Sequence, residues 1–236
     1  MVALSELIRE LELSKRPPLA ETATVGPDVL ILRLGWFGDR SDMDRVMAHA
    51  RSAGALILDL RGNGGGLEDG LQRLAGYVLD QPRLIATIRR RHEVRRIESK
   101  PASHPFAGRL FVLIDSGSAS ASEIFARLIQ LYGRGVVLGD RSAGAVMRSQ
   151  MYDLTTGIDA VSFYALSVTD ADVIMADGTR LEGVGVQPDR MVLPTADDLA
   201  TGRDPVLAVA LTLAGYPTDA ARAATLLPRR SAGAAR

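Results

Sequence analysis

The stretch "LILDLRGNGGGLEDGL", residues 56–71, contains the features that decide the fold. Residues 55–60 form an almost continuous apolar run, which is typical of a strand covered on both faces. Four of the next six residues are glycines, and residues 67–79 then place apolar side chains at helical spacing. The order of strand, glycine-rich loop and helix predicts one unit of an α/β fold.

The same alternation continues along the chain on both sides of this unit. Further strands are expected at 29–35, 110–114 and 135–139, and further helices at 41–54, 119–132 and 204–215. We expect a charged hairpin over 83–100 and antiparallel strands over 160–186 with a turn at 176–179. The domain organisation is therefore an N-terminal helix and Pro-rich connector at 1–27, a main α/β domain at 28–218, and a disordered tail at 219–236.

The composition excludes several classes of protein. The net charge is zero, so no overall basic excess points to nucleic acid. There is no cysteine, and the three histidines (His49, His92 and His104) are far apart, so we expect neither metal nor cofactor. No apolar run reaches membrane-spanning length and no signal peptide is evident, which predicts a cytoplasmic protein without a membrane partner. A longer natural N-terminus would instead allow a periplasmic or secreted location.

The glycine-rich loop has several interpretations. A phosphate-binding Walker loop would end in lysine and serine or threonine, but Leu67 and Glu68 follow Gly66 here. A dinucleotide-binding G-x-G-x-x-G pattern fails because its last position is Leu67. The remaining interpretations are an oxyanion hole, built from bare backbone N–H groups, and a flexible connection without a ligand. The loop alone leaves both open.

A second stretch, "IDSGSASASEIFARL" at 114–128, also has two interpretations. Ser120 and Glu123 form the Ser-x-x-Glu signature of a helix capping box. A serine at a strand-to-helix turn is also well placed as a nucleophile, because the N–H of the next residue, Ala121, can stabilise the oxyanion that forms. This stretch alone does not separate a helix cap from a catalytic serine.

Four motifs taken in order indicate a family. They are "LILDLRGNGGG", "LFVLIDSGSASASEIFA", "YGRGVVLGDRSAGAVMRS" and "DGTRLEGVGVQPD". The set resembles the tail-specific, or C-terminal processing, peptidases of family S41, with the tricorn protease core as a relative, over roughly residues 28–215. The resemblance implies an α/β core of the ClpP/crotonase type with stacked ββα units. Many relatives insert a PDZ module before the core, and we expect none in this sequence.

The resemblance also implies a set of site residues. Ser120 corresponds to the nucleophile, and the backbone N–H groups of Gly66 and Ala121 correspond to the oxyanion donors. In the tricorn-like branch a glutamate just before the Gly-Val-x-Pro-Asp segment orients the catalytic base, and Glu182 occupies that place.

The catalytic base is the point at which this sequence departs from the family. The lysine of the processing peptidases falls at Ala145, and the glutamine that orients it falls at Ser149. Arg148 cannot replace the lysine, because a guanidinium stays protonated. The tricorn-like branch uses a histidine from a region before the core, where this sequence has none. His104 is then the candidate base by default.

Two functions are compatible with these residues. The first is a serine peptidase that cleaves peptide or protein substrates through an acyl-enzyme at Ser120. The alternative is a catalytically impaired member of the fold that binds peptides or apolar ligands without cleavage. The serine and the glycine loop favour the first function, whereas the missing lysine favours the second. The basic stretch at 89–96 indicates a solvated hairpin face rather than a nucleic-acid site. The sequence does not decide whether the chain forms a homo-oligomer.

Overall fold

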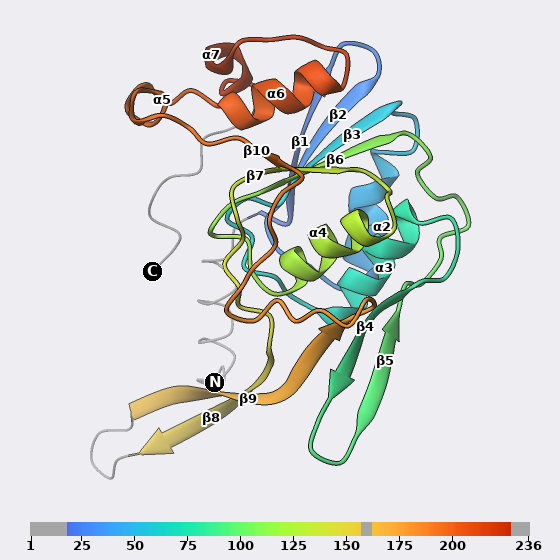
Figure 1. Cartoon of the computed structure of the whole chain (residues 1–236), viewed down its shortest axis with the longest axis vertical. Helices are drawn as coiled ribbons and strands as arrows, with labels where there is room; N and C mark the ends of the chain where they lie inside the picture. Colours follow the sequence, from blue (N-terminus) through green and yellow to red (C-terminus); the bar gives the residue numbers. More distant parts are fainter. Residues whose placement is uncertain (1–17, 157–161, 228–236) are drawn as a thin grey trace, which may run out of the picture.

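The computed structural model describes residues 18–156 and 162–227, which form two β-sheets and their covering helices (Figure 1). One sheet has six strands in the order β1-β2-β3-β6-β7-β10, and the other has four in the order β5-β4-β9-β8. The six-stranded sheet comprises β1 (Ala20–Val25), β2 (Val29–Leu34), β3 (Ala55–Asp59), β6 (Arg109–Ile114), β7 (Val136–Gly139) and β10 (Arg190–Met191). The four-stranded sheet comprises β4 (Leu84–Arg89), β5 (Val94–Glu98), β8 (Arg148–Thr156) and β9 (Ser162–Met175). The helices are α2 (Arg40–Ala48), α3 (Glu68–Val78), α4 (Ala121–Leu131), α5 (Ala196–Thr201), α6 (Pro205–Leu213) and α7 (Ala220–Ala223).

The six-stranded sheet is covered on both faces, as its apolar runs predict. Strands β2, β3, β6, β7 and β10 are parallel, and β1 is an antiparallel edge strand. In β3, Leu56 and Leu58 belong to the core shared with α2, α3 and α4, whereas Ala55 and Ile57 belong to the core under α6 and α7. The prediction of a strand buried on both sides is therefore confirmed.

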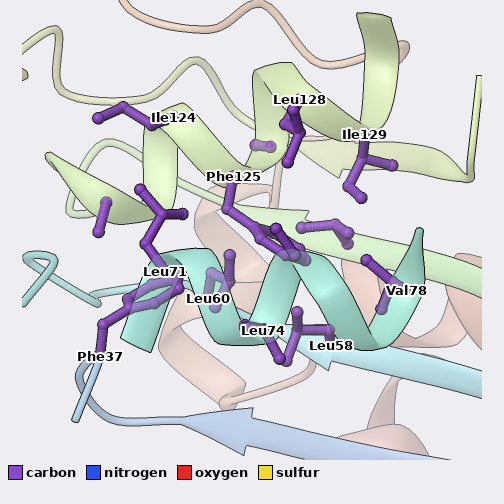
Figure 2. Close-up of a cluster of buried hydrophobic side chains, with 14 of the residues drawn as sticks. Phe37, Leu58, Leu60, Leu71, Leu74, Val78, Ile124, Phe125, Leu128 and Ile129 are labelled. Atoms are coloured by element: carbon purple, nitrogen blue, oxygen red, sulfur yellow. The ribbon is translucent and has the colours of Figure 1, made fainter. Parts of the chain in front are cut away.

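The larger core lies between α3, α4 and the sheet (Figure 2). The ring centroids of Phe37 and Phe125 are 6.3 Å apart, and both side chains are fully buried. Leu74 of α3 and Leu128 of α4 pack into the same cluster. Burying each of these side chains contributes about 1.5–3 kcal/mol. This packing fixes the start of α4 relative to the start of α3, which is where the candidate site lies.

Two predicted elements differ from the structure. The helix expected at 41–54 ends at Ala48, and it is capped by Asp39 rather than by Ser41. The turn at 176–179 is present, since the Met175 N–H bonds to the Thr179 carbonyl oxygen. The residues after that turn do not pair with β9, however. Strand β8 is an antiparallel partner of β9, and the N–H of Gly183 bonds to the Gly144 carbonyl oxygen.

The expected domain boundaries also need correction at both ends. Part of the predicted connector is strand β1, which pairs with β2 along its whole length. Part of the predicted tail is helix α7, and Ala223 and Leu227 are buried in the core under α6. The helix expected before residue 18 lies outside the described residues. Within the described ranges, every helix is too short or too polar to cross a membrane.

A buried ionic network joins the carboxyl end of β3 to α6. Asp59 is almost completely buried and accepts hydrogen bonds from Arg33 at 3.2 Å and from Arg61 at 2.9 Å. Arg61 also binds Asp204, the N-cap residue of α6, at 2.8 Å. Burial is the largest single effect and would raise the pKa of Asp59, but the charges of Arg61 and Arg33 and the hydrogen bonds from Arg61 together outweigh burial and lower the pKa to about 2.

We expect this network to make folding stability depend on pH in a defined window. The pKa of Asp59 in the folded chain lies below its ordinary value of 3.8, so its stabilising effect is complete well above pH 3.8 and is lost as the pH falls toward 2. The loss is about 2 kcal/mol in the free energy of unfolding. Urea unfolding at a series of pH values measures this loss in the free energy of unfolding. Asp59→Asn is the control, because it has no carboxylate to titrate at this position. An equally steep pH dependence in the variant would contradict the assignment.

Candidate active site

The glycine-rich loop and the serine segment meet at one edge of the six-stranded sheet. They follow β3 and β6, which are parallel neighbours, so both leave the sheet at its carboxyl edge. The N–H of Ala119 bonds to the Asn63 carbonyl oxygen at 3.0 Å, and the N–H of Gly62 bonds to the Asp115 carboxylate at 2.8 Å. A pocket of about 380 Å³ opens where the loops meet, and both Gly66 and Ser120 line it.

The three alternating serines have different roles. Ser118 and Ser122 are fully buried, and their hydroxyls donate to the carbonyl oxygens of Leu60 at 2.8 Å and Asn63 at 2.9 Å. These bonds fasten the serine segment to the glycine-rich loop. Ser120 lies between them and faces the pocket. The equal spacing of the three serines does not predict this division, since alternate residues of an extended segment share one face.

The backbone of Ser120 is strained. Its φ is 55° and its ψ is −117°, and it is the single non-glycine residue with a positive φ in the described part of the chain. Such a conformation costs of order 1–3 kcal/mol and is concentrated at functional sites. Ser120 is also the N-cap residue of α4, so the strain places its hydroxyl at a strand-to-helix turn, as in the nucleophile elbow of serine hydrolases.

Two positions of the loop require glycine, because Ser120 lies close to Gly65 and the backbone of Phe37 lies close to Gly66. Gly65 has a φ of 104°, and a Cβ there would lie 2.7 Å from the Cβ of Ser120. Gly66 has a φ of 149°, and a Cβ there would collide with the Phe37 carbonyl oxygen. Among the described residues, the N–H groups of Gly66 and Ala121 have no hydrogen-bond acceptor. They are therefore available to a ligand.

Glu123 organises the backbone around Ser120. It is fully buried, and its carboxylate accepts from the N–H of Ser120 at 3.0 Å, as the capping-box pattern predicts. It also accepts from the Ser142 hydroxyl at 2.6 Å and from the N–H groups of Gly144 and Ala145 at 2.7 and 2.9 Å. Glu123 therefore joins the serine turn to the segment around Ala145. The sequence showed the cap but not this second role.

The structure does not bring Glu182 and His104 together. Oε2 of Glu182 accepts from the N–H groups of Val146 and Met147 at 2.8 and 2.9 Å, so this carboxylate holds the segment after Ala145. His104 is exposed and precedes β6, whereas Ser120 follows it. The six residues of β6 span about 20 Å, so His104 lies at the opposite end of the strand from the pocket.

The other histidines are no closer to the site. His49 is the C-cap residue of α2, and His92 is exposed in the turn between β4 and β5. Neither of them lines the pocket in the part of the chain that the structure describes.

The titratable groups that do line the pocket are Glu68 and Arg148. Arg95 donates two hydrogen bonds to Glu68, at 2.6 and 2.7 Å, and these bonds hold the pKa of Glu68 below its ordinary value. Glu68 is thus a weak base. Arg148 lies 4.0 Å from Asp170, and a guanidinium does not serve as a base. Most of the remaining pocket wall is apolar: Leu67, Leu71, Ile88, Ile97, Ile124, Val146, Met147 and Val173.

A strained serine at the start of a helix, with two unoccupied N–H groups beside it, is the arrangement of enzymes that transfer acyl groups through a serine. The chain belongs to peptidase family S41, whose family model matches residues 28–192. The family and the mixed α/β fold that the four motifs indicated are therefore confirmed.

The relatives of this chain include processing peptidases. The tail-specific protease of Haemophilus influenzae is 31% identical over 67% of this chain and 24% of its own length. The carboxy-terminal-processing protease of Bartonella bacilliformis is 32% identical over 64% of this chain and 34% of its own length. The crystal structure of the tricorn protease is 19% identical with a TM-score of 0.59, over 79% of this chain and 17% of that one. The chain thus spans about a third or less of these relatives.

Proposed function

We propose that this chain is a serine peptidase that cleaves peptide bonds through an acyl-enzyme on Ser120. The observation that carries the proposal is the strained Ser120 turn, which lies against the N–H groups of Gly66 and Ala121 at the wall of the pocket. These N–H groups are placed to hold the oxyanion that forms when the serine oxygen attacks a carbonyl carbon. The apolar side chains in the pocket wall, such as Leu71, Ile88 and Val173, suit contact with an apolar side chain of a substrate.

The chemical steps follow from this arrangement. The Ser120 oxygen bonds to the carbonyl carbon as its proton leaves to a base, and the C–N bond then breaks with protonation of the departing amine. Water hydrolyses the resulting ester and restores the serine. The described pocket residues supply the nucleophile and the oxyanion donors but no histidine or lysine. We therefore do not retain His104 as the base, and we assign Glu182 the role of holding residues 146–147.

A fluorophosphonate probe tests the proposal directly, because it reacts with an activated serine beside an oxyanion hole. We expect one adduct in the intact mass of the chain and none for Ser120→Ala. Ser116→Ala, an exposed serine of the same loop, is the matched control and is expected to label like the unmodified chain. A folded chain that does not label, or labelling that persists in Ser120→Ala, would contradict a peptidase that acts through Ser120.

The second candidate function is the binding of peptides or apolar ligands without cleavage. The specific observation in its favour is Ala145 at the family's lysine position, together with the lack of a neutral base among the described pocket residues. A chain that does not label, yet gives saturable heat of binding with an apolar peptide in calorimetry, would support this function over the first.

A further inference from the structure

Arg148 brings a guanidinium group with available hydrogen-bond donors to the pocket that contains Ser120. It lies at the start of β8, and both residues line the pocket. Nε of Arg148 lies 4.0 Å from Oδ1 of Asp170, which is beyond hydrogen-bond range. Within residues 18–156 and 162–227, the guanidinium group donates no hydrogen bond to a protein acceptor. Its N–H donors can therefore bind a group that enters the pocket.

The other charged groups around this pocket already have hydrogen-bonded partners. Both carboxylate oxygens of Glu68 accept from Arg95, at 2.6 and 2.7 Å. Those bonds are the main cause of the low pKa of Glu68, and the nearby charge of Arg148 adds to the effect. Oδ2 of Asp170 accepts from Arg90 at 2.8 Å. A basic group of a ligand would have to compete with Arg95 for Glu68, whereas an anionic group can bond to Arg148 directly.

The backbone that carries Arg148 is held in a fixed position relative to Ser120. The N–H of Ser120 bonds to the Ala145 carbonyl oxygen at 2.9 Å, three residues before Arg148. The carboxylate of Glu182 accepts from the next two N–H groups of the chain, at 2.8 and 2.9 Å, and Arg148 then pairs with β9. A donor group on a backbone that is already ordered loses less entropy when it binds a ligand.

We propose that Arg148 selects substrates by binding an aspartate or glutamate side chain of the peptide. The inference rests on the proposed function of Ser120 and names a class of substrate for it. A guanidinium binds a carboxylate through two parallel N–H···O bonds, which are stronger than bonds between neutral groups. The pocket of about 380 Å³ is about 9 Å across, and an extended peptide rises about 3.3 Å per residue. The acidic residue therefore lies within about three residues of the bond that Ser120 attacks.

The open position of Arg148 favours a side-chain carboxylate over the carboxylate at the end of a peptide. The side chain of Arg148 is 40% exposed, so it lies at the rim of the pocket. Strand β8 continues from this rim into the ribbon that it forms with β9, away from the body of the molecule (Figure 1, lower left). A bound peptide can therefore continue past Arg148, whereas a site for the end of a chain would be closed on that side.

Peptide binding to Ser120→Ala tests the proposal in the absence of cleavage. The probes are short, capped, fluorescein-labelled peptides of alanine and leucine, in which one glutamate is moved through every position, and the matched peptides carry glutamine instead. We expect at least one glutamate peptide to bind about fivefold more tightly than its glutamine match in fluorescence anisotropy. Adding Arg148→Met should reduce this ratio to less than about twofold. A ratio near unity at every position up to about 1 mM, or a preference that persists with Arg148→Met, would overturn the proposal.

Two further variants and one further set of peptides serve as controls. Arg91→Met removes the same charge from an exposed position in the turn between β4 and β5, and it should leave the glutamate preference unchanged. Arg148→Lys retains the charge but not the planar pair of donors, so it should keep only part of the preference. Glutamine peptides with an uncapped C-terminus test the other source of a carboxylate. If they depend on Arg148 and bind more tightly than the glutamate peptides, the assignment to a side-chain carboxylate is wrong.

The result is distinguishable from that of the fluorophosphonate test, because Ser120→Ala cannot form an acyl-enzyme. A glutamate preference in a chain that does not label would retain the carboxylate site and assign it to binding without cleavage. Labelling of Ser120 without any glutamate preference would retain the proposed peptidase and overturn the inference about Arg148.

Discussion

Replacing Ala145 with lysine is expected to raise the rate at which a fluorophosphonate labels Ser120 by about 10²-fold or more. General-base catalysis contributes about 10²–10⁴-fold when a base lies within reach of the nucleophile. The position is already adjacent to the serine, because the N–H of Ser120 donates to the Ala145 carbonyl oxygen at 2.9 Å. Ala145 is exposed, so a four-carbon side chain has room there.

The pH dependence of Ala145→Lys should identify the amine as the base. A lysine accepts a proton only in its neutral form, and the nearby cation Arg148 favours that form. The labelling rate of the variant should therefore rise with pH until the amine is deprotonated, over a range in which the unmodified chain changes little. This readout separates a catalytic amine from a general change in the accessibility of Ser120.

Two variants control for the size and the charge of the new side chain. Ala145→Met adds a long side chain without an amine, and Ala143→Lys adds the amine at an exposed position two residues earlier. Neither should label faster than the unmodified chain by more than about threefold. If Ala145→Lys labels no faster than these controls, the lack of a lysine at position 145 does not limit the reactivity of Ser120. The serine would then lack some other part of the family's geometry.

The elements and the family could be predicted because their signals are local. The continuous apolar runs at 55–60 and 110–114 identify strands buried on both faces, and the four motifs occur in the family's order. The pairing of β9 was predicted wrongly because a turn signal shows where the chain reverses but not which segment becomes the strand partner. The segment after the turn binds the loop at 142–146 instead.

The candidate site was predictable only where one motif contains the whole arrangement. Ser120 and Ala121 are adjacent, and the glycine loop follows a neighbouring strand. His104 is 16 residues from Ser120 in sequence, but strand β6 lies between them, so the two residues are at opposite ends of that strand. The roles of Ser118, Ser122 and Asn63 depend on hydrogen bonds between segments about 60 residues apart, which no local pattern reveals.

Glu123→Ala is expected to lower the free energy of unfolding by about 4 kcal/mol or more. Its carboxylate accepts four hydrogen bonds in a fully buried position, from the N–H groups of Ser120, Gly144 and Ala145 and from the Ser142 hydroxyl. Each buried donor left without an acceptor costs about 1–3 kcal/mol. Urea unfolding at neutral pH measures the loss. Glu98→Ala, at a half-exposed position on β5, is the control and should cost no more than about 0.5 kcal/mol.

The same variant should lose the reactivity of Ser120 even under conditions where it is folded. The strained φ of Ser120 persists only while its surroundings over-determine it, and the carboxylate of Glu123 fixes the Ser120 N–H and the Ala145 N–H together. Glu123→Gln retains one acceptor oxygen and places an amide against the remaining donors, so it should fall between the unmodified chain and Glu123→Ala in both stability and labelling rate. Full labelling of a folded Glu123→Ala would show that the serine turn holds its conformation without this carboxylate.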